Sequence, residues 1–177
     1  MDKYQERYLE HIRYKLSKNP KKTIYNAKDI DSLYRIMKNR KSVRHFNNNE
    51  ISKADLEMIE LSVDLAPSSC NRKGIYLKEC SPQYAENILV GGTGWAKNAN
   101  KVFLMFGAKL CYKNPKEIPY MPYLDAGFVA ENIYLACEAI GIGCCFINPN
   151  LKEPVEFLAT HGEDYFCGAI ALGEYDG

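Results

Sequence analysis

The chain has 177 residues, of which 46% are hydrophobic, with seven cysteines and a formal net charge of +1. This length suits one domain with a sizeable core, which we expect to span residues 1–177, with 1–30 as an N-terminal helical extension. A nearly neutral chain has no overall field to attract nucleic acid or an anionic membrane surface. No apolar run approaches the roughly 18 residues that a membrane span needs. The polar start and the cysteine usage predict a cytoplasmic protein with reduced thiols.

The first half of the chain is predicted to be mainly helical. Apolar residues recur every four positions over 3–17, which indicates one stripe of an amphipathic helix. A second helix is predicted over 31–38. A third begins at Ser52, whose spacing to Asp55 is that of a capping box, and ends before Pro67. The residues expected to face inward are Leu33, Ile36 and Met37 in the second helix, and Leu56, Ile59, Val63 and Leu65 in the third.

The second half alternates strand and helix patterns. The run AGFVAENIYLACEAIG, 126–141, is apolar almost all round, which is typical of a buried helix, and Gly141 is suited to end it. Strands are predicted at 75–80, 101–108, 144–148 and 167–173, and further helices at 82–90 and 151–159. The chain thus begins with several helices and continues with strands that are separated by helices. This order indicates the α+β class.

The basic segment RKSVRHF, 40–46, is a candidate anion site. Arg40 and Arg44 share a face in a helix, and in an extended segment Ser42 joins them on that face. Two guanidinium groups and a hydroxyl suit a phosphate, because each guanidinium can donate paired hydrogen bonds to its oxygens. A solvated basic cluster is the alternative interpretation of this segment.

The loop APSSCN, 66–71, follows the third helix directly. Ser68, Ser69 and Asn71 offer donors and acceptors that suit the rim of a heteroaromatic ligand. The same residue types are common in ordinary turns, so a purely structural loop is the alternative.

Several other chemistries find no support in the sequence. The stretch GGTGWAKN, 91–98, lacks the Gly-Lys-Ser/Thr ending of a phosphate-binding P-loop. None of the cysteines forms a CxxC pair and the three histidines are scattered, so we expect no metal site. No residue pattern indicates a nucleophile, and we assign no catalytic side chain.

The order of these segments resembles that of the nitroreductase-like FMN-dependent oxidoreductases. RKSVRHF and APSSCN are similar to the family's Arg-x-Ser-x-Arg/Lys-x-Phe and Ala-Pro-Ser-Ser/Ala-x-Asn segments. The family's central strand resembles GWAKNANKVFLMFG in this chain. Its long buried helix and the strand after it resemble DAGFVAENIYLACEAIGIGCCFIN, and its closing strand resembles CGAIALGEY. The resemblance covers about 36–175. It implies a three-layer α+β fold, in which helices flank a central, mostly antiparallel sheet and one long helix is buried.

The resemblance also implies that FMN binds at a homodimer interface. In that arrangement Arg40, Ser42 and Arg44 would meet the phosphate, the ribityl chain and the pyrimidine edge. The isoalloxazine would be contacted by Pro67, Ser68, Ser69 and Asn71 of the other subunit, and would lie beside Phe146, Ile147 and Asn148, where a backbone N–H can reach N5. Lys73 stands where family members commonly have Gln, and it is expected to reach a flavin oxygen.

The activity implied is reduction of the flavin by NAD(P)H, followed by its reoxidation by a small organic acceptor such as a nitroaromatic or a quinone. The family's basic pair near the C-terminus has no counterpart in GEYDG, so the arginines of 40–46 are expected to hold the phosphate largely alone. This departure leaves an alternative function open, an FMN storage or sensing protein without turnover. For the helix over 3–17, packing on the neighbouring subunit and packing on its own subunit are both open.

Overall fold

The computed structural model describes residues 24–47, 49–112, 119–162 and 164–176. The helix predicted over 3–17 therefore lies outside the described residues, and so does the surface on which it packs. Within the described ranges, no helix combines the length and the apolar character that crossing a bilayer requires.

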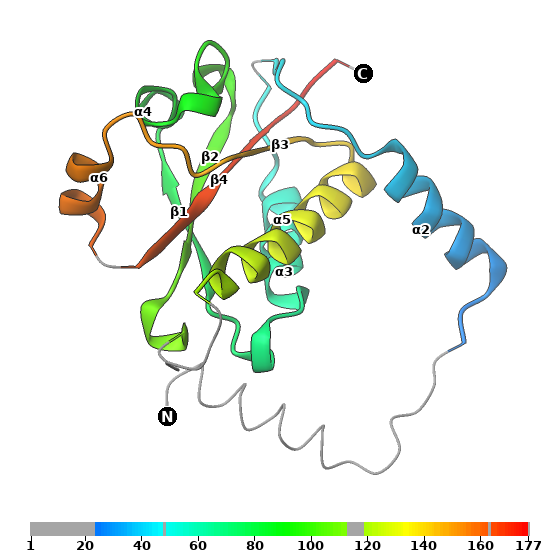
Figure 1. Ribbon diagram of the computed structural model, residues 1–177. Helices are drawn as coiled ribbons and strands as arrows, with labels where there is room; N and C mark the ends of the chain where they lie inside the picture. Colours follow the sequence, from blue (N-terminus) through cyan, green and yellow to red (C-terminus); the bar gives the residue numbers. More distant parts are fainter. Residues whose placement is uncertain (1–23, 48, 113–118, 163, 177) are drawn as a thin grey trace.

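A four-stranded antiparallel sheet forms the middle layer of the molecule (Figure 1). Its strands follow one another across the sheet in the order β1-β2-β4-β3. The central pair registers Leu104 opposite Ala169, both fully buried. The predicted antiparallel sheet is thus confirmed. The strands are β1 (Ile75–Cys80), β2 (Lys101–Gly107), β3 (Gly143–Ile147) and β4 (Tyr165–Gly173).

Helices α3 (Lys53–Leu65) and α5 (Met121–Ile140) cover one face of the sheet, and α2 (Ala27–Asn39) lies against α5 (Figure 1). Helix α5 packs on α3, and the Asn132 side chain donates a hydrogen bond to the Ser62 carbonyl at 3.1 Å. Helix α5 begins five residues earlier than predicted, because Pro122 is tolerated in a first helical turn. It ends at Gly141, which has the predicted left-handed conformation with φ 79°.

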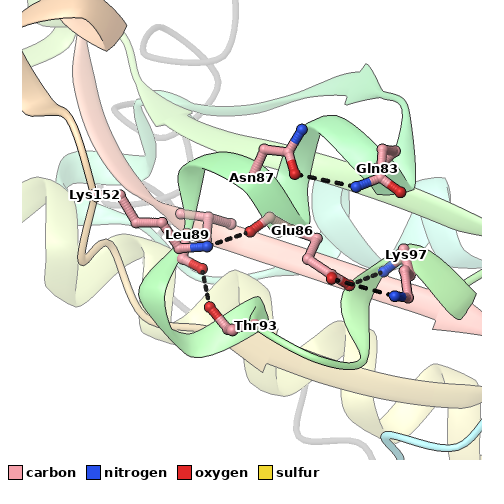
Figure 2. Close-up of polar contacts among 7 residues, drawn as sticks. All are labelled: Gln83, Glu86, Asn87, Leu89, Thr93, Lys97 and Lys152. Atoms are coloured by element: carbon pink, nitrogen blue, oxygen red, sulfur yellow. Dashed lines mark hydrogen bonds and ion pairs between the residues drawn. The ribbon is translucent and has the colours of Figure 1, made fainter.

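The other face is covered by α4 (Pro82–Ile88), α6 (Pro154–His161) and two short 3₁₀ turns, η2 (Val90–Gly92) and η3 (Ala96–Asn98). Figure 2 shows that Glu86 of α4 forms hydrogen bonds with two neighbouring segments. Its carboxylate accepts the Lys97 backbone N–H at 3.1 Å, and its carbonyl accepts the Lys152 ammonium at 2.8 Å. The glycine-rich stretch 91–98 is therefore a packed connection on α4.

The prediction that Leu33 and Met37 face inward is wrong. These side chains are 51% and 50% exposed, and α2 has no buried residue. Leu65 of α3 is likewise 68% exposed. The periodic pattern identified an apolar face correctly, but a pattern does not reveal whether that face meets the same chain or another one.

Candidate functional site

The basic segment 40–46, called here the arginine segment, runs extended beside strand β3. The Val43 backbone N–H donates to the Cys144 carbonyl at 2.9 Å, and the Val43 side chain is buried. Alternation along an extended chain places the neighbours Ser42 and Arg44 outward, and both are exposed. The extended form of the two geometries considered for this segment is therefore the one observed.

Tyr134 of α5 connects the arginine segment to β3. Its hydroxyl oxygen lies 2.9 Å from Ser42 Oγ and accepts the Phe146 backbone N–H at 2.7 Å. The Arg40 guanidinium carbon lies 5.0 Å from the centre of the Tyr134 ring. One buried tyrosine thus contacts an arginine, a serine and a backbone amide that all belong to predicted site segments.

The second arginine packs on a different ring. The Arg44 guanidinium carbon lies 5.9 Å from the centre of the Trp95 ring, and the Trp95 indole N–H donates to the Gly91 carbonyl at 2.9 Å. Among the described residues, neither Arg40 nor Arg44 forms an ion pair with a carboxylate. Within these residues, no carboxylate therefore competes with an anion for the two positive charges.

The two arginine charges also affect the pKa values of two thiols in β3, those of Cys144 and Cys145. Burial raises the pKa of Cys145, and the nearby Arg44 charge opposes that rise. Burial likewise raises the pKa of Cys144, with the Arg40 charge opposing it. Because both thiols stay protonated near neutral pH, neither supplies the negative charge that would balance the arginines.

A groove of about 400 Å³ lies next to Tyr134, between α5 and the end of β3. Phe146, Pro149 and Cys167 line its sheet side. Phe146 is half-buried here, whereas the Ile147 side chain is 2% exposed and packs in the core on the opposite face of the sheet. Asn148 is exposed where β3 ends. Of these three predicted residues, only Phe146 presents its side chain to the groove.

The second predicted segment is the loop 67–73, called here the serine loop, which contains the 3₁₀ turn η1 (Ser69–Asn71). The Ser69 backbone N–H donates to both carboxylate oxygens of Asp125, at 2.9 and 3.0 Å. The Ser68 hydroxyl accepts the Lys73 backbone N–H at 2.9 Å. Asp125 is 1% exposed, so this carboxylate fixes the loop from inside the protein.

Arg72 closes the loop network. Its guanidinium donates to the Ser69 carbonyl at 3.0 Å and to the Ser69 hydroxyl at 2.8 Å. It also lies over the Tyr112 ring, 5.4 Å from its centre. Tyr112 belongs to the 3₁₀ turn η4 (Lys109–Tyr112) and donates its hydroxyl to Asp125 at 2.9 Å. Burial and the Asp125 charge raise the pKa of Tyr112, which keeps this donor protonated.

Three residues of the serine loop have a left-handed backbone: Cys70, Asn71 and Lys73, with φ of 51°, 54° and 52°. Such a conformation costs a residue other than glycine about 1–3 kcal/mol, so the surrounding hydrogen bonds must hold it. The Lys73 ammonium is bonded back to the Ala66 carbonyl. Asn71 is half-buried and Pro67 is exposed.

The two groups of predicted residues contact different parts of α5. Asp125 anchors the serine loop and Tyr134 anchors the arginine segment, nine residues further along the helix. At 1.5 Å and 100° per residue, the two anchors are about 13 Å apart along the axis and about half a turn out of phase. One chain therefore presents the two groups at separate places.

Sequence reasoning missed Tyr134, Asp125 and Trp95 as parts of the site. A signal for the first two is present, because a carboxylate and a phenol inside an almost entirely apolar helix require buried partners. For Trp95 the sequence offers no comparable signal, since its place under Arg44 depends on how 91–98 packs on α4.

The family model described as the Nitroreductase family matches residues 81–173, which is more than half of the chain. This range includes Asp125, Tyr134 and Phe146, whereas the arginine segment and the serine loop precede it. No curated protein matches the chain.

Solved structures share the fold at low sequence identity. Nitroreductase A from Vibrio parahaemolyticus has a TM-score of 0.69 at 20% identity, covering 82% of this chain and 69% of its own. An FMN-dependent nitroreductase from Clostridium difficile has a TM-score of 0.66 at 23% identity, covering 80% and 87%. A nitroreductase with bound FMN from Bacteroides fragilis has a TM-score of 0.60 at 20% identity, covering 86% and 90%.

Proposed function

The chain belongs to the nitroreductase family, and from this premise we propose that it is an FMN-dependent oxidoreductase. NAD(P)H is the proposed electron donor, and a small organic acceptor such as a nitroaromatic or a quinone is the proposed second substrate. When bound, FMN supplies the redox chemistry, because it takes a hydride equivalent from a nicotinamide and passes electrons to an acceptor. The chain itself has to bind, orient and enclose the cofactor.

The observation that carries the proposal is the pair of unneutralised arginines on either side of Ser42. A phosphate brings about −1.5 to −2 charges at neutral pH, which two guanidinium groups can balance. Arg40 and Arg44 are held against aromatic rings and leave their N–H donors for such an anion. We therefore assign the FMN phosphate to the arginine segment.

The flavin ring is proposed to lie at the 400 Å³ groove beside Phe146. An aromatic lining favours a planar heteroaromatic ligand. The backbone N–H groups considered for N5 are those of Phe146, Ile147 and Asn148. The Phe146 N–H already donates to the Tyr134 hydroxyl, and Ile147 pairs with β4 in the sheet. This leaves Asn148, where β3 ends, as the proposed donor.

The serine loop is proposed to reach the flavin from a second subunit. Within one chain it is anchored about 13 Å along α5 from Tyr134 and about half a turn away, so a twofold partner offers the way to unite the two groups. In such a dimer Ser68, Ser69 and Asn71 would face the ring. The Lys73 ammonium would first have to leave the Ala66 carbonyl to reach a flavin oxygen.

Exposed apolar side chains support the homodimer. Helices α2, α3 and α5 each present exposed apolar residues at helical spacing, and such stripes mark interaction surfaces. We propose that this apolar helix face is the dimer interface. Its residues are Ile30, Leu33, Tyr34 and Met37 in α2, Met58, Leu61 and Leu65 in α3, and Leu124 and Phe128 in α5.

The compartment is proposed to be the cytoplasm. All seven cysteines are free thiols, which is the usual state of cysteines in a reducing compartment.

Anaerobic reduction tests the proposed activity. The purified full chain is incubated with FMN, free FMN is removed by gel filtration, and the complex is mixed with NADH or NADPH in a stopped-flow spectrometer. An oxidoreductase loses its flavin absorbance and regains it when a quinone or nitroaromatic is added. Flavin that stays oxidised with both nucleotides identifies the storage or sensing alternative. A chain that retains no FMN overturns both functions.

A further inference from the structure

The hydroxyl of Tyr134 has a hydrogen-bond arrangement with a defined direction. A backbone N–H can only donate, so Tyr134 must accept from Phe146, at 2.7 Å. The phenolic proton is then available to Ser42 Oγ at 2.9 Å, and the Cys145 thiol lies beside both hydroxyls. Burial raises the pKa of Tyr134, which keeps that proton in place at neutral pH.

This direction determines what Ser42 can do. A serine hydroxyl that accepts from Tyr134 retains one proton to donate, and the Ser42 side chain is exposed. The flanking residues Arg40 and Arg44 favour an anion at the same place. Hydrogen bonds in a chain polarise one another, so each donor in the series strengthens the next.

On the basis of the proposed FMN site, we propose that Tyr134 is a positioning residue that orients the Ser42 hydroxyl as a donor to the phosphate of FMN. The relay runs from the Phe146 N–H to the Tyr134 hydroxyl, from there to the Ser42 hydroxyl, and then to a phosphoryl oxygen. The Tyr134 hydroxyl itself does not touch the phosphate in this scheme, although the Tyr134 ring lines the groove proposed for the flavin. It also supports Arg40, which lies over its ring.

The test compares FMN with riboflavin, which lacks the phosphate, by fluorescence titration of the full chain. The variants are Tyr134→Phe, Ser42→Ala and the double variant. Tyr134→Phe keeps the ring under Arg40 and removes only the hydroxyl. We expect it to weaken FMN binding by about five- to tenfold, which is typical for one lost hydrogen bond, and to leave riboflavin binding unchanged. Ser42→Ala should have a similar effect, and the double variant should bind no worse than Ser42→Ala alone.

Multiplicative losses in the double variant would show that the two residues act independently and would overturn the relay. Equal losses for FMN and riboflavin would assign Tyr134 a structural role only. Tyr165→Phe, which removes a hydroxyl from a tyrosine at the start of β4, is the control and should bind both flavins like the wild type.

Thermal unfolding reports whether each variant is folded. If Tyr134→Phe does not fold, Ser42→Ala, at an exposed position, tests the outer half of the relay alone. In that case an unchanged FMN affinity overturns the proposal. A wild-type chain that binds neither flavin overturns the proposed function together with this inference. If the wild type binds FMN but the losses of affinity in the double variant are multiplicative, only the inference is overturned.

Discussion

Both carboxylate oxygens of Asp125 accept the backbone N–H of Ser69, at 2.9 and 3.0 Å. This contact fixes a loop with three left-handed residues to a helix that is largely buried. The anchor is a charged group that is almost fully enclosed, and such a group is stable only while its hydrogen-bond donors remain in place.

Replacing this anchor should loosen the serine loop. In Asp125→Asn the amide nitrogen cannot accept from Ser69 or Tyr112, so at least one buried donor loses its partner. We expect the free energy of unfolding to fall by about 1–3 kcal/mol and FMN binding to weaken by about tenfold. Urea unfolding and flavin titration measure the two effects. Asp31→Asn, at an exposed position of α2, is the control, and an Asp125 variant as stable as this control would contradict the assignment.

The strand conformation beside the groove depends on Gly168. This residue has φ 124°, and a Cβ there would lie 2.6 Å from the Ile147 carbonyl oxygen and 2.7 Å from the Phe146 ring. The register between β2 and β4 shifts at the same level, between Met105 and Phe106. A side chain at 168 therefore requires β3 to move.

Gly168→Ala should lower the free energy of unfolding by about 2–4 kcal/mol, since it combines backbone strain with a clash against the main chain. The matched control is Gly127→Ala in α5, where a Cβ meets nothing within 4 Å. That control should be stabilising by about 0.5–1 kcal/mol, because alanine is favoured over glycine inside a helix. Chemical denaturation compares them, and equal stabilities would show that Gly168 is not required.

The apolar helix face should control oligomeric state. Phe128 is 49% exposed on α5, and Phe128→Glu would place a charge in the proposed dimer interface. We expect this variant to sediment as a monomer and to lose FMN, because the serine loop of the partner is no longer present. Val155→Glu alters an apolar residue that is 84% exposed on α6, away from that face, and should remain dimeric. A dimeric Phe128→Glu variant that retains FMN would contradict the interface.

Stability should decline at alkaline pH. Burial raises the pKa of Cys167 from its ordinary value of 9.0 to about 12, and that of Cys80 to about 11. The folded state therefore holds these protons more tightly than the unfolded state. Their contribution is complete below pH 9 and is lost as the pH rises from 9 through the folded pKa values.

Urea unfolding of the wild type should accordingly give a constant free energy between about pH 6 and 8 and a decreasing one above pH 9. Cys167→Ala should lower stability at neutral pH, because it leaves a gap in the core, and should decline less steeply between pH 9 and 10. Above pH 10 the buried tyrosines add their own decline, since burial also raises the pKa of Tyr112 and Tyr134. An identical slope in the variant would show that Cys167 does not contribute.

Much of the fold was predictable from local patterns. Strand β2 and helix α5 were found because continuous apolar runs differ in length between strands and helices, and the Gly141 end was marked by its residue type. The outward position of Leu33 and Met37 was not predictable, because helical periodicity identifies an apolar face but not what that face contacts. The start of α5 at Met121 was missed because two prolines and two tyrosines in 119–123 favoured a loop.

The candidate site was likewise predictable in its local segments but not in its long-range contacts. The arginine segment and the serine loop could be selected by residue type and order, but their separation along α5 depends on three-dimensional packing. The hydroxyl of Tyr134 meets Ser42 across 92 positions of sequence, and no spacing rule relates residues so distant. The same holds for Trp95 under Arg44.

The measurement that tests the central claim most directly is a fluorescence titration of FMN with the purified full chain, together with its Arg40→Ala/Arg44→Ala variant. We predict saturation at one FMN per chain for the wild type, and affinity about 100-fold lower for the variant, because two charge-assisted contacts to the phosphate are lost. Lys28→Ala/Lys78→Ala removes the same charge from exposed positions and should bind like the wild type. Absence of FMN binding by the wild type, or equal affinities for both double variants, would contradict the account.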